Sequence, residues 1–297
     1  MKRLKFWFFE TRPQFLTLSV VLAFLGTTIA WHEGYFNLGH ALLASIGLVF
    51  AHVSVNTLND YFDYRSGIDL KTRRTPFSGG SGILPAGQLR PQDVLWLGLG
   101  SLLLAVIIGI YFVLTSGYLL LPLLIVAALF ILIYSPFILK RPWPEWAAGV
   151  GLGALPILGM YFVQVGAYTL PALIASIPSA FLVHNLLLLN EFPDAEADQQ
   201  ANRKTLPIML GKSRTAFFYS AVALAVYVWI IGWVAAQVMP VWTLLALLTL
   251  PLTIRAISGA RHYDDVSRLM AGMAANVMSM LIIQLLMGIG YILSHIF

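Results

Sequence analysis

The sequence predicts an all-α integral membrane protein with nine transmembrane helices around a central cavity. Hydrophobic residues make up 59% of the 297 residues and charged residues 10%, whereas a soluble domain carries about 25% charged residues. Nine apolar runs are long enough, or nearly so, to cross the hydrocarbon core of a bilayer. We expect them to form a single domain over residues 1–297. The runs cover residues 14–31, 40–58, 92–114, 118–138, 146–166, 170–190, 214–236, 240–257 and 268–294.

The basic residues predict the orientation of these helices. All 18 Lys and Arg residues fall in the N-terminal segment, or in or around connections on one side of the predicted spans, and the opposite connections hold one charge, Glu33. By the positive-inside rule the basic side is cytoplasmic, so the N-terminus lies inside and the C-terminus outside a prokaryotic plasma membrane. The net charge of +5 then reflects topology and attraction to anionic membrane lipid, and we expect no nucleic-acid partner.

A first cluster of polar residues stands where the second predicted span ends. If residues 40–64 are helical, Asn56, Asn59, Asp60 and Asp63 are spaced i, i+3, i+4 and i+7 and share one face. Acidic and amide groups at the end of a membrane helix are costly unless something satisfies them. Because carboxylate and amide oxygens suit hard cations, the spacing favours a Mg²⁺ site.

A second cluster repeats this pattern at the end of the sixth predicted span. Asn190, Asp194 and Asp198 are spaced i, i+4 and i+8, so Asn59-x-x-x-Asp63 and Asn190-x-x-x-Asp194 look like one element used twice. Two pseudo-symmetric four-helix halves plus a ninth helix would bring the clusters together across a cavity. Since Mg²⁺ binds through one or two carboxylates plus substrate phosphates, we expect a diphosphate between them. The alternative is two ordinary acidic helix ends, which two matched clusters among only 13 acidic residues disfavour.

Several basic and hydroxyl side chains lie close in sequence to these clusters and are candidates for binding a diphosphate. The glycine run at residues 79–82 lets backbone N–H groups approach an anion, and the loop at 65–91 that contains it is a candidate lid or simply a flexible connection. Arg12 either binds a phosphate or extends its side chain toward the membrane surface, and the sequence favours these two roles equally. Lys140 either binds a phosphate or contacts lipid head groups. The candidates are Arg12, Arg74 with its neighbour Arg73, Lys140, Lys204, Tyr134 and Ser135.

One histidine lies deeper in the predicted second span. His52 precedes Asn56 by one helical turn on the same face. It either borders a cavity beside the metal cluster or is a packed, neutral histidine.

Over nearly its whole length, the chain resembles the UbiA superfamily of membrane prenyltransferases. Asn59-Asp60-x-x-Asp63 is similar to the first Asp-rich motif of that family, and Asp194-x-x-x-Asp198 followed by Lys204-Thr-Leu is similar to the second. Tyr134 with Lys140 resembles a third signature. Many members carry an Asp where this chain has Gly67, with Asp69 two residues later.

This resemblance implies a function for the clusters. The family transfers a polyprenyl group from its diphosphate to an acceptor, usually aromatic, inside a helical bundle that opens laterally to lipid. It implies that two Mg²⁺ ions are held by catalytic carboxylates, with Asn56, Asn59 and Asn190 completing or orienting the ligands. Arg74, Lys140 and Lys204 would bind phosphate oxygens. The catalytic carboxylates would be Asp60, Asp63, Asp69, Asp194 and Asp198.

The acceptor is the least determined part of this expectation. The Gly67-Ile-Asp69 spacing, together with Tyr161 and Gln164, is similar to the branch that prenylates 1,4-dihydroxy-2-naphthoate for menaquinone, and we place His52, Asn56, Tyr161 and Gln164 around the acceptor. Other acceptors stay open: 4-hydroxybenzoate, a chlorophyll precursor, haem or a glycerol lipid. A transporter or lipid-binding protein also has cavity acids, but its site usually lies near the midplane of the membrane. We expect no obligate protein partner.

Overall fold

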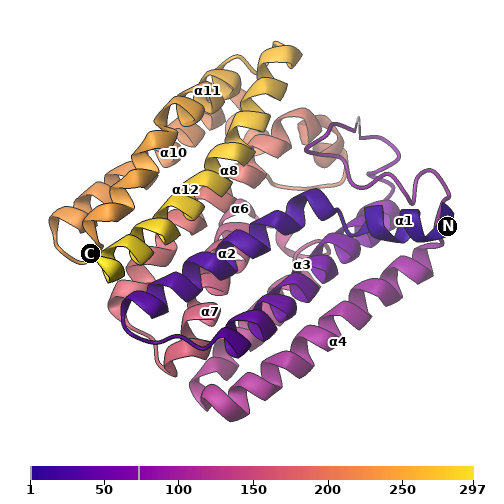
Figure 1. Ribbon diagram of the computed structural model, residues 1–297. Coiled ribbons are helices and arrows are strands. Elements are labelled where there is room, and N and C mark those ends of the chain that lie inside the picture. The colour runs from indigo at the N-terminus through magenta and orange to yellow at the C-terminus, as the bar shows by residue number, and fades with distance from the viewer. Residues whose placement is uncertain (1, 73) are drawn as a thin grey trace.

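The computed structural model describes residues 2–72 and 74–297, so Arg73 lies outside the described residues. Over this range the chain is helical with no strands (Figure 1). Eight helical stretches are long and apolar enough to cross a membrane. They are α2 (Pro13–His32), α3 (Leu38–Ser66), α4 (Pro91–Ser116), Glu145–Val165, α8 (Leu170–Gln200), α10 (Lys212–Ala235), Val241–Arg261 and α12 (Val266–Ile296).

The predicted fourth span is shorter than expected. A 3₁₀ turn at Tyr118–Leu120 leads into α5 (Leu121–Ile133), and together they form a shorter apolar helix, Tyr118–Ile133. The helix ends just before Ser135, because a residue that precedes proline is disfavoured in the helical conformation. The described residues therefore contain eight stretches long enough to cross a membrane and one shorter apolar helix of 10–17 residues. The count of nine spans, with two symmetric halves, stays a prediction.

Two of the long stretches change helix type along their length, and short helices connect the others. Glu145–Val165 consists of α6 (Glu145–Ala148), a π-helical segment (Gly149–Ala154) and α7 (Leu155–Val165), whose second residue is Pro156. Proline lacks the N–H that an α-helix needs, and the wider π turn precedes it. The remaining elements are α1 (Lys2–Glu10), a 3₁₀ turn at Ile138–Lys140, α9 (Leu206–Leu210), a 3₁₀ helix at Val241–Thr249 and α11 (Leu250–Arg261).

Both acidic motifs lie in the last turns of long helices that continue past the predicted spans. The predicted span 40–58 continues as α3 to Ser66, where Gly67 ends the helix with a φ of 76°. The predicted span 170–190 continues as α8 to Gln200 despite Pro193. Because both helices run on past the apolar stretch, each motif is held on a rigid helical face.

The helices pack so that α3 and α8 border one interior space. α2 lies against α3, α7 and α12, while α8 packs on the π-helical segment and on α10. The close approach of α8 to the π-helical segment needs glycine, because a Cβ on Gly153 would lie 2.8 Å from the Cα of Ala180. The N-terminus and the connection between α3 and α4 lie at one end of the bundle, and the C-terminus lies at the opposite end (Figure 1).

Candidate active site

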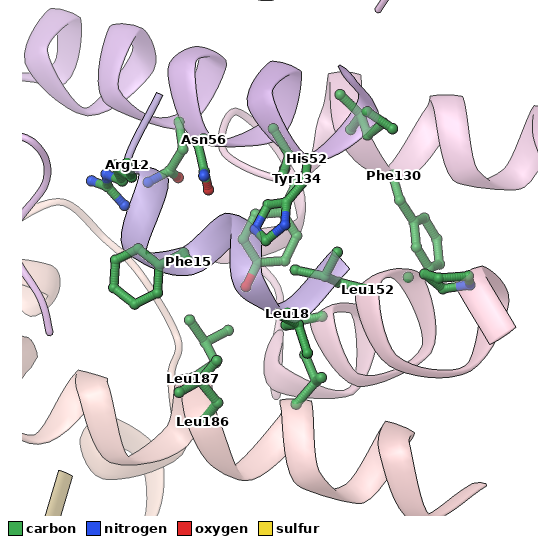
Figure 2. Close-up of a pocket in the computed structure, with 18 of the residues that line it drawn as sticks. Arg12, Phe15, Leu18, His52, Asn56, Phe130, Tyr134, Leu152, Leu186 and Leu187 are labelled. Atoms are coloured by element: carbon green, nitrogen blue, oxygen red, sulfur yellow. The ribbon is translucent and has the colours of Figure 1, made fainter. Parts of the chain in front are cut away.

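A cavity of about 390 Å³ lies between the helices, with one polar end and apolar walls. Figure 2 shows Arg12 and Asn56 toward one side of it, with Phe130 on the other and Leu186 and Leu187 along its wall. Such a space suits a ligand with a charged head and a long apolar tail. The acidic and amide residues that line the polar end are Asn56, Asn59, Asp63, Asp69, Asn190, Glu191, Asp194 and Asp198.

The acids of α3 are held by cations and by a neighbouring loop. Asp60 is buried and forms an ion pair with Arg12, and it also accepts a hydrogen bond of 2.8 Å from the backbone N–H of Ser81. The amide of Asn59 donates to Asp63 at 3.3 Å, and its oxygen accepts from the Ser135 hydroxyl at 2.7 Å. The predicted first cluster is therefore held by separate sets of contacts, one at Asp60 and one at Asn59 and Asp63.

Arg203 joins the two acidic helices. Its guanidinium pairs with Asp63 of α3 and, at 2.8 Å, with Asp198 of α8. The neighbouring Lys204, the phosphate-binding residue predicted from the sequence, has an exposed side chain. After α8 ends, Asn202 adopts a left-handed conformation with a φ of 57°, and the N–H of Arg203 bonds back to the carbonyl of Asp198. This turn directs Arg203 inward, which spacing alone does not show.

The glycine-rich loop bridges the same two helices. Ser78 donates to Asp194 of α8 at 3.2 Å, while Ser81 binds Asp60 of α3. Gly80 has a φ of 72°, and a Cβ there would lie 3.2 Å from the Asp69 carboxylate. Close packing against these acids therefore requires glycine. In this structure the anion held by the Ser81 N–H is the carboxylate of Asp60.

Two further carboxyl groups lie among like charges: that of Asp69, half-buried in the connection after α3, and that of Glu10, buried at the end of α1. Burial, followed by the charges of Asp63 and Asp60, raises the pKa of Asp69 to about 7. Burial and then the charge of Asp60 raise the pKa of Glu10 to about 8, and its carboxylate accepts a hydrogen bond of 2.8 Å from the Ser81 hydroxyl. Desolvation favours the neutral form of a carboxyl group. A cation bound beside these acids would therefore stabilise their ionised forms.

The predicted cations differ in their placement. Arg12 lines the cavity, whereas Arg74 lines a separate hollow of about 560 Å³ between α1 and the glycine-rich loop. Lys140 and Lys204 have exposed side chains. The N–H of Lys204 bonds to the carbonyl of Leu139, a cavity-lining residue, at 3.1 Å. Both lysines thus lie beside the cavity and do not contact its acids.

Two predicted acceptor residues lie elsewhere, and we remove them from the candidate site. The Tyr161 hydroxyl bonds to Glu33 and accepts from Thr169 at 3.0 Å, while Gln164 donates to the carbonyl of Asn37 at 3.1 Å. Both are absent from the cavity lining among the described residues. They stand at the far end of α7, and their hydrogen bonds tie that end to the connection between α2 and α3.

His52 and Asn56 do line the cavity. His52 is buried and its Nδ1 lies 2.8 Å from the Ser19 hydroxyl, so it has a structural partner as well as a cavity face. The Asn56 amide donates to the carbonyl of Thr11 at 3.1 Å, which fixes the start of α2 against α3.

Some buried polar atoms of the cavity wall have no hydrogen-bond partner. Among the described residues they are the Arg12 Nε, the Tyr134 hydroxyl, the Asn190 Oδ1 and both carboxylate oxygens of Glu191. Glu191 belongs to the second acidic cluster of the sequence, but it is not among the site residues that the sequence predicts.

The donor set fits Mg²⁺ bound together with a diphosphate. Among residues 2–72 and 74–297, no three His, Asp or Glu side chains converge closely enough to hold a metal ion by themselves. Mg²⁺, however, is usually held by one or two carboxylates with phosphate and water oxygens supplying the rest. Asp63, Asp69, Asp194 and Asp198 line one cavity, and the unpartnered oxygen of Asn190 offers a further ligand.

An intramembrane bundle with paired acidic helices at the end of a long apolar cavity defines a membrane enzyme that acts on an amphiphilic anion. The sequence model of the UbiA prenyltransferase family matches residues 19–289. The chain therefore belongs to the UbiA prenyltransferase family and is an integral membrane prenyltransferase. The resemblance inferred from the motifs is confirmed.

Curated relatives match the chain over almost its full length. It is 27% identical over 288 residues to the 1,4-dihydroxy-2-naphthoate octaprenyltransferase of Bacillus subtilis, covering 96% of this chain and 91% of that one. It is 25% identical over 306 residues to the Escherichia coli enzyme of the same name, covering 99% and 97%.

Solved structures show the same fold. A UbiA homologue from Aeropyrum pernix superposes with a TM-score of 0.72 at 17% identity, covering 94% of this chain and 98% of that one. An Archaeoglobus fulgidus homologue bound to GPP and Mg²⁺ superposes with a TM-score of 0.62 at 15% identity, covering 98% and 100%.

Proposed function

We propose that this prenyltransferase uses Mg²⁺ to transfer a polyprenyl group from its diphosphate to 1,4-dihydroxy-2-naphthoate, a step of menaquinone biosynthesis. The observation that carries the proposal is the meeting of α3 and α8, whose acids border the polar end of one apolar cavity and are joined by Arg203. The acceptor rests on the two octaprenyltransferases that match nearly the whole chain. The GPP and Mg²⁺ bound to the Archaeoglobus homologue support the donor and the metal.

The chain's own residues account for how the diphosphate is bound. Asp63 and Asp69 on one side, and Asp194 and Asp198 on the other, would hold Mg²⁺. When bound, the metal supplies positive charge that stabilises the departing diphosphate. Arg203 already lies between these acids, where its planar guanidinium can bind phosphate oxygens.

The apolar part of the cavity has a separate role. Walls made of leucine and phenylalanine side chains, including Leu18, Phe130 and Leu152 (Figure 2), would take the polyprenyl tail and exclude water. Exclusion of water protects the allylic cation from hydrolysis until the electron-rich ring attacks it. Asp60, which the sequence predicts as a metal-binding carboxylate, is absent from the described cavity lining and is bound by Arg12 and Ser81. In this proposal it positions Arg12 at the boundary between head and tail and is not a metal ligand.

We place the site at the cytoplasmic face of a plasma membrane. This orientation is supported by the 18 basic residues, all of which are on the predicted cytoplasmic side, and by the position of the N-terminus at the end that carries the loop between α3 and α4 (Figure 1).

The test is a transfer assay with purified protein, Mg²⁺ and radiolabelled polyprenyl diphosphate, challenged with a panel of acceptors. We expect prenylation of 1,4-dihydroxy-2-naphthoate that stops when EDTA removes the metal. The panel includes a glycerol lipid acceptor, since a Thermococcus kodakarensis digeranylgeranylglyceryl phosphate synthase is 29% identical over 210 residues. Transfer to 4-hydroxybenzoate or to the glycerol lipid but not to the naphthoate would overturn the acceptor assignment.

A further inference from the structure

Among the described residues, one wall of the cavity carries buried polar atoms without a hydrogen-bond partner. Glu191 is 5% exposed, it lines the cavity, and both of its carboxylate oxygens lack a hydrogen-bond partner. The hydroxyl of Tyr134, on the same cavity, is also buried and unpartnered. Buried polar groups in folded proteins are nearly always hydrogen-bonded, so a cluster of unsatisfied ones facing a cavity indicates a ligand.

Tyr134 and Glu191 come from two different elements that line the same cavity. Tyr134 follows α5 and lies within electrostatic reach of Glu191 on α8. In Figure 2 the Tyr134 ring stands inside the cavity, with its hydroxyl directed toward the part of α8 that carries Leu186 and Leu187. A single small ligand can therefore contact both side chains.

Glu191 lies at the boundary between the polar and apolar parts of the cavity. On α8 it follows Leu187 by four residues and precedes Asp194 by three, and side chains with these spacings share a face. A ligand at this height lies between the predicted diphosphate site and the predicted tail site, where the bond to the prenyl group forms.

The chemistry of the two side chains selects the ligand. The neighbouring acid, Glu145, is fully buried, and one of its oxygens accepts the N–H of Leu206 at 2.7 Å. Its other oxygen has no partner among the described residues and belongs to the carboxyl group that interacts with Glu191, so these two acids can share one proton and still leave a Glu191 oxygen free for a ligand. The nearby cation Arg203 is already shared by Asp63 and Asp198. Acid groups without a cation of their own repel phosphates and carboxylates, but they accept hydrogen bonds from hydroxyl groups.

We propose that Tyr134 and Glu191 form the subsite that recognises a ring hydroxyl of the aromatic acceptor. The acceptor hydroxyl donates to the Glu191 carboxyl group, and the Tyr134 hydroxyl donates to the acceptor oxygen. This inference rests on the proposed function. It assigns the acceptor to the α5–α8 side of the cavity. Because like charges repel, any carboxylate of the acceptor points away from Glu191.

The first test compares the kinetics of variants. Glu191→Met removes both oxygens at similar volume, and we expect the KM for the acceptor to rise at least tenfold while the KM for polyprenyl diphosphate changes less than twofold. Tyr134→Phe should act in the same direction with a smaller effect. The matched control is Glu196→Met, which removes an exposed carboxylate from the same helix and should leave both constants unchanged.

Thermal stability in detergent separates recognition from a structural role. Because the variant replaces an unsatisfied buried carboxyl by an apolar group, Glu191→Met should unfold at the same temperature as the wild type or higher. A lower unfolding temperature together with equal losses for donor and acceptor would mean that Glu191 holds the fold, and would overturn the inference.

Acceptor analogues test the hydroxyl itself. We would measure inhibition constants of 1-hydroxy-2-naphthoate, 4-hydroxy-2-naphthoate and 2-naphthoate with wild type and Glu191→Met. We expect the variant to bind at least one hydroxylated analogue about tenfold more weakly and 2-naphthoate equally well. Equal effects on all three, or no effect on any, would refute the subsite. If the wild type uses no aromatic acceptor, the proposed function itself fails; if it does but Glu191→Met is unaltered, only this inference fails.

Discussion

Arg203 offers the most direct test of how the two acidic helices are held together. Its side chain is 14% exposed and pairs with Asp63 of α3 and Asp198 of α8. The change Arg203→Met removes both ion pairs and leaves two buried carboxylates without this cation. Because removing one partner of a buried ion pair costs about 3–5 kcal/mol, we expect a stability loss of that order when EDTA keeps metal away.

The assay is thermal unfolding in detergent, followed by tryptophan fluorescence. For domains of about 150–250 residues, 1 kcal/mol shifts Tm by about 2–4 °C, so Tm should fall by roughly 6–20 °C. Mg²⁺ should restore more stability to Arg203→Met than it adds to the wild type, because in the wild type the guanidinium competes with the metal for the same carboxylates. Prenyl transfer should fall by about 10²–10³-fold, as when one charge-stabilising donor is removed from an active site.

Two comparisons make this prediction refutable. Arg214→Met, at an exposed position, should leave Tm unchanged. In an Asp63→Asn background the loss caused by Arg203→Met should shrink, because the two changes remove the same interaction. If Arg203→Met unfolds at the wild-type temperature in EDTA, or if its effect adds fully to that of Asp63→Asn, the bridge between α3 and α8 is not what stabilises the site.

Three further predictions concern catalysis, pH and topology. Asp194→Ala should abolish transfer in a folded protein, while Glu196→Ala should leave transfer at the wild-type rate, since i+2 lies off the shared face; near-normal turnover of Asp194→Ala would contradict the paired-acid site. Folding raises the pKa of Glu10 from 4.5 to about 8. At a pH between these two values, Glu10 is protonated in the folded protein and ionised in the unfolded chain. Stability should therefore decline as pH rises through that interval, and Glu10→Gln should raise Tm at pH 9 but not at pH 4; equal shifts at both would exclude this cause. Reporter fusions should read cytoplasmic in the loop 65–90 and external at Phe297, and an external signal from the loop would reverse the topology.

The sequence by itself determined the class of the protein and the chemistry of its site. Long apolar runs can satisfy their backbone groups in lipid only as helices, so the all-α membrane fold follows from composition. The regular helical period places Asn59 and Asp63 on one face of α3 and Asn190 and Asp194 on one face of α8. The family follows from these motifs, and its model matches residues 19–289.

The tertiary structure decided which neighbours of those motifs face the cavity. Arg203 and Lys204 are adjacent cations, and the left-handed turn at Asn202 directs the first inward and leaves the second exposed. Tyr161 matched a family pattern, but its hydroxyl bonds to Glu33 at the far end of the bundle. A motif gives the residue type at a position; it does not give the level in the bundle at which that position lies. Glu191 shows the same limit: sequence gives its place on α8, but its burial without a partner arises only from the packing of other elements around it.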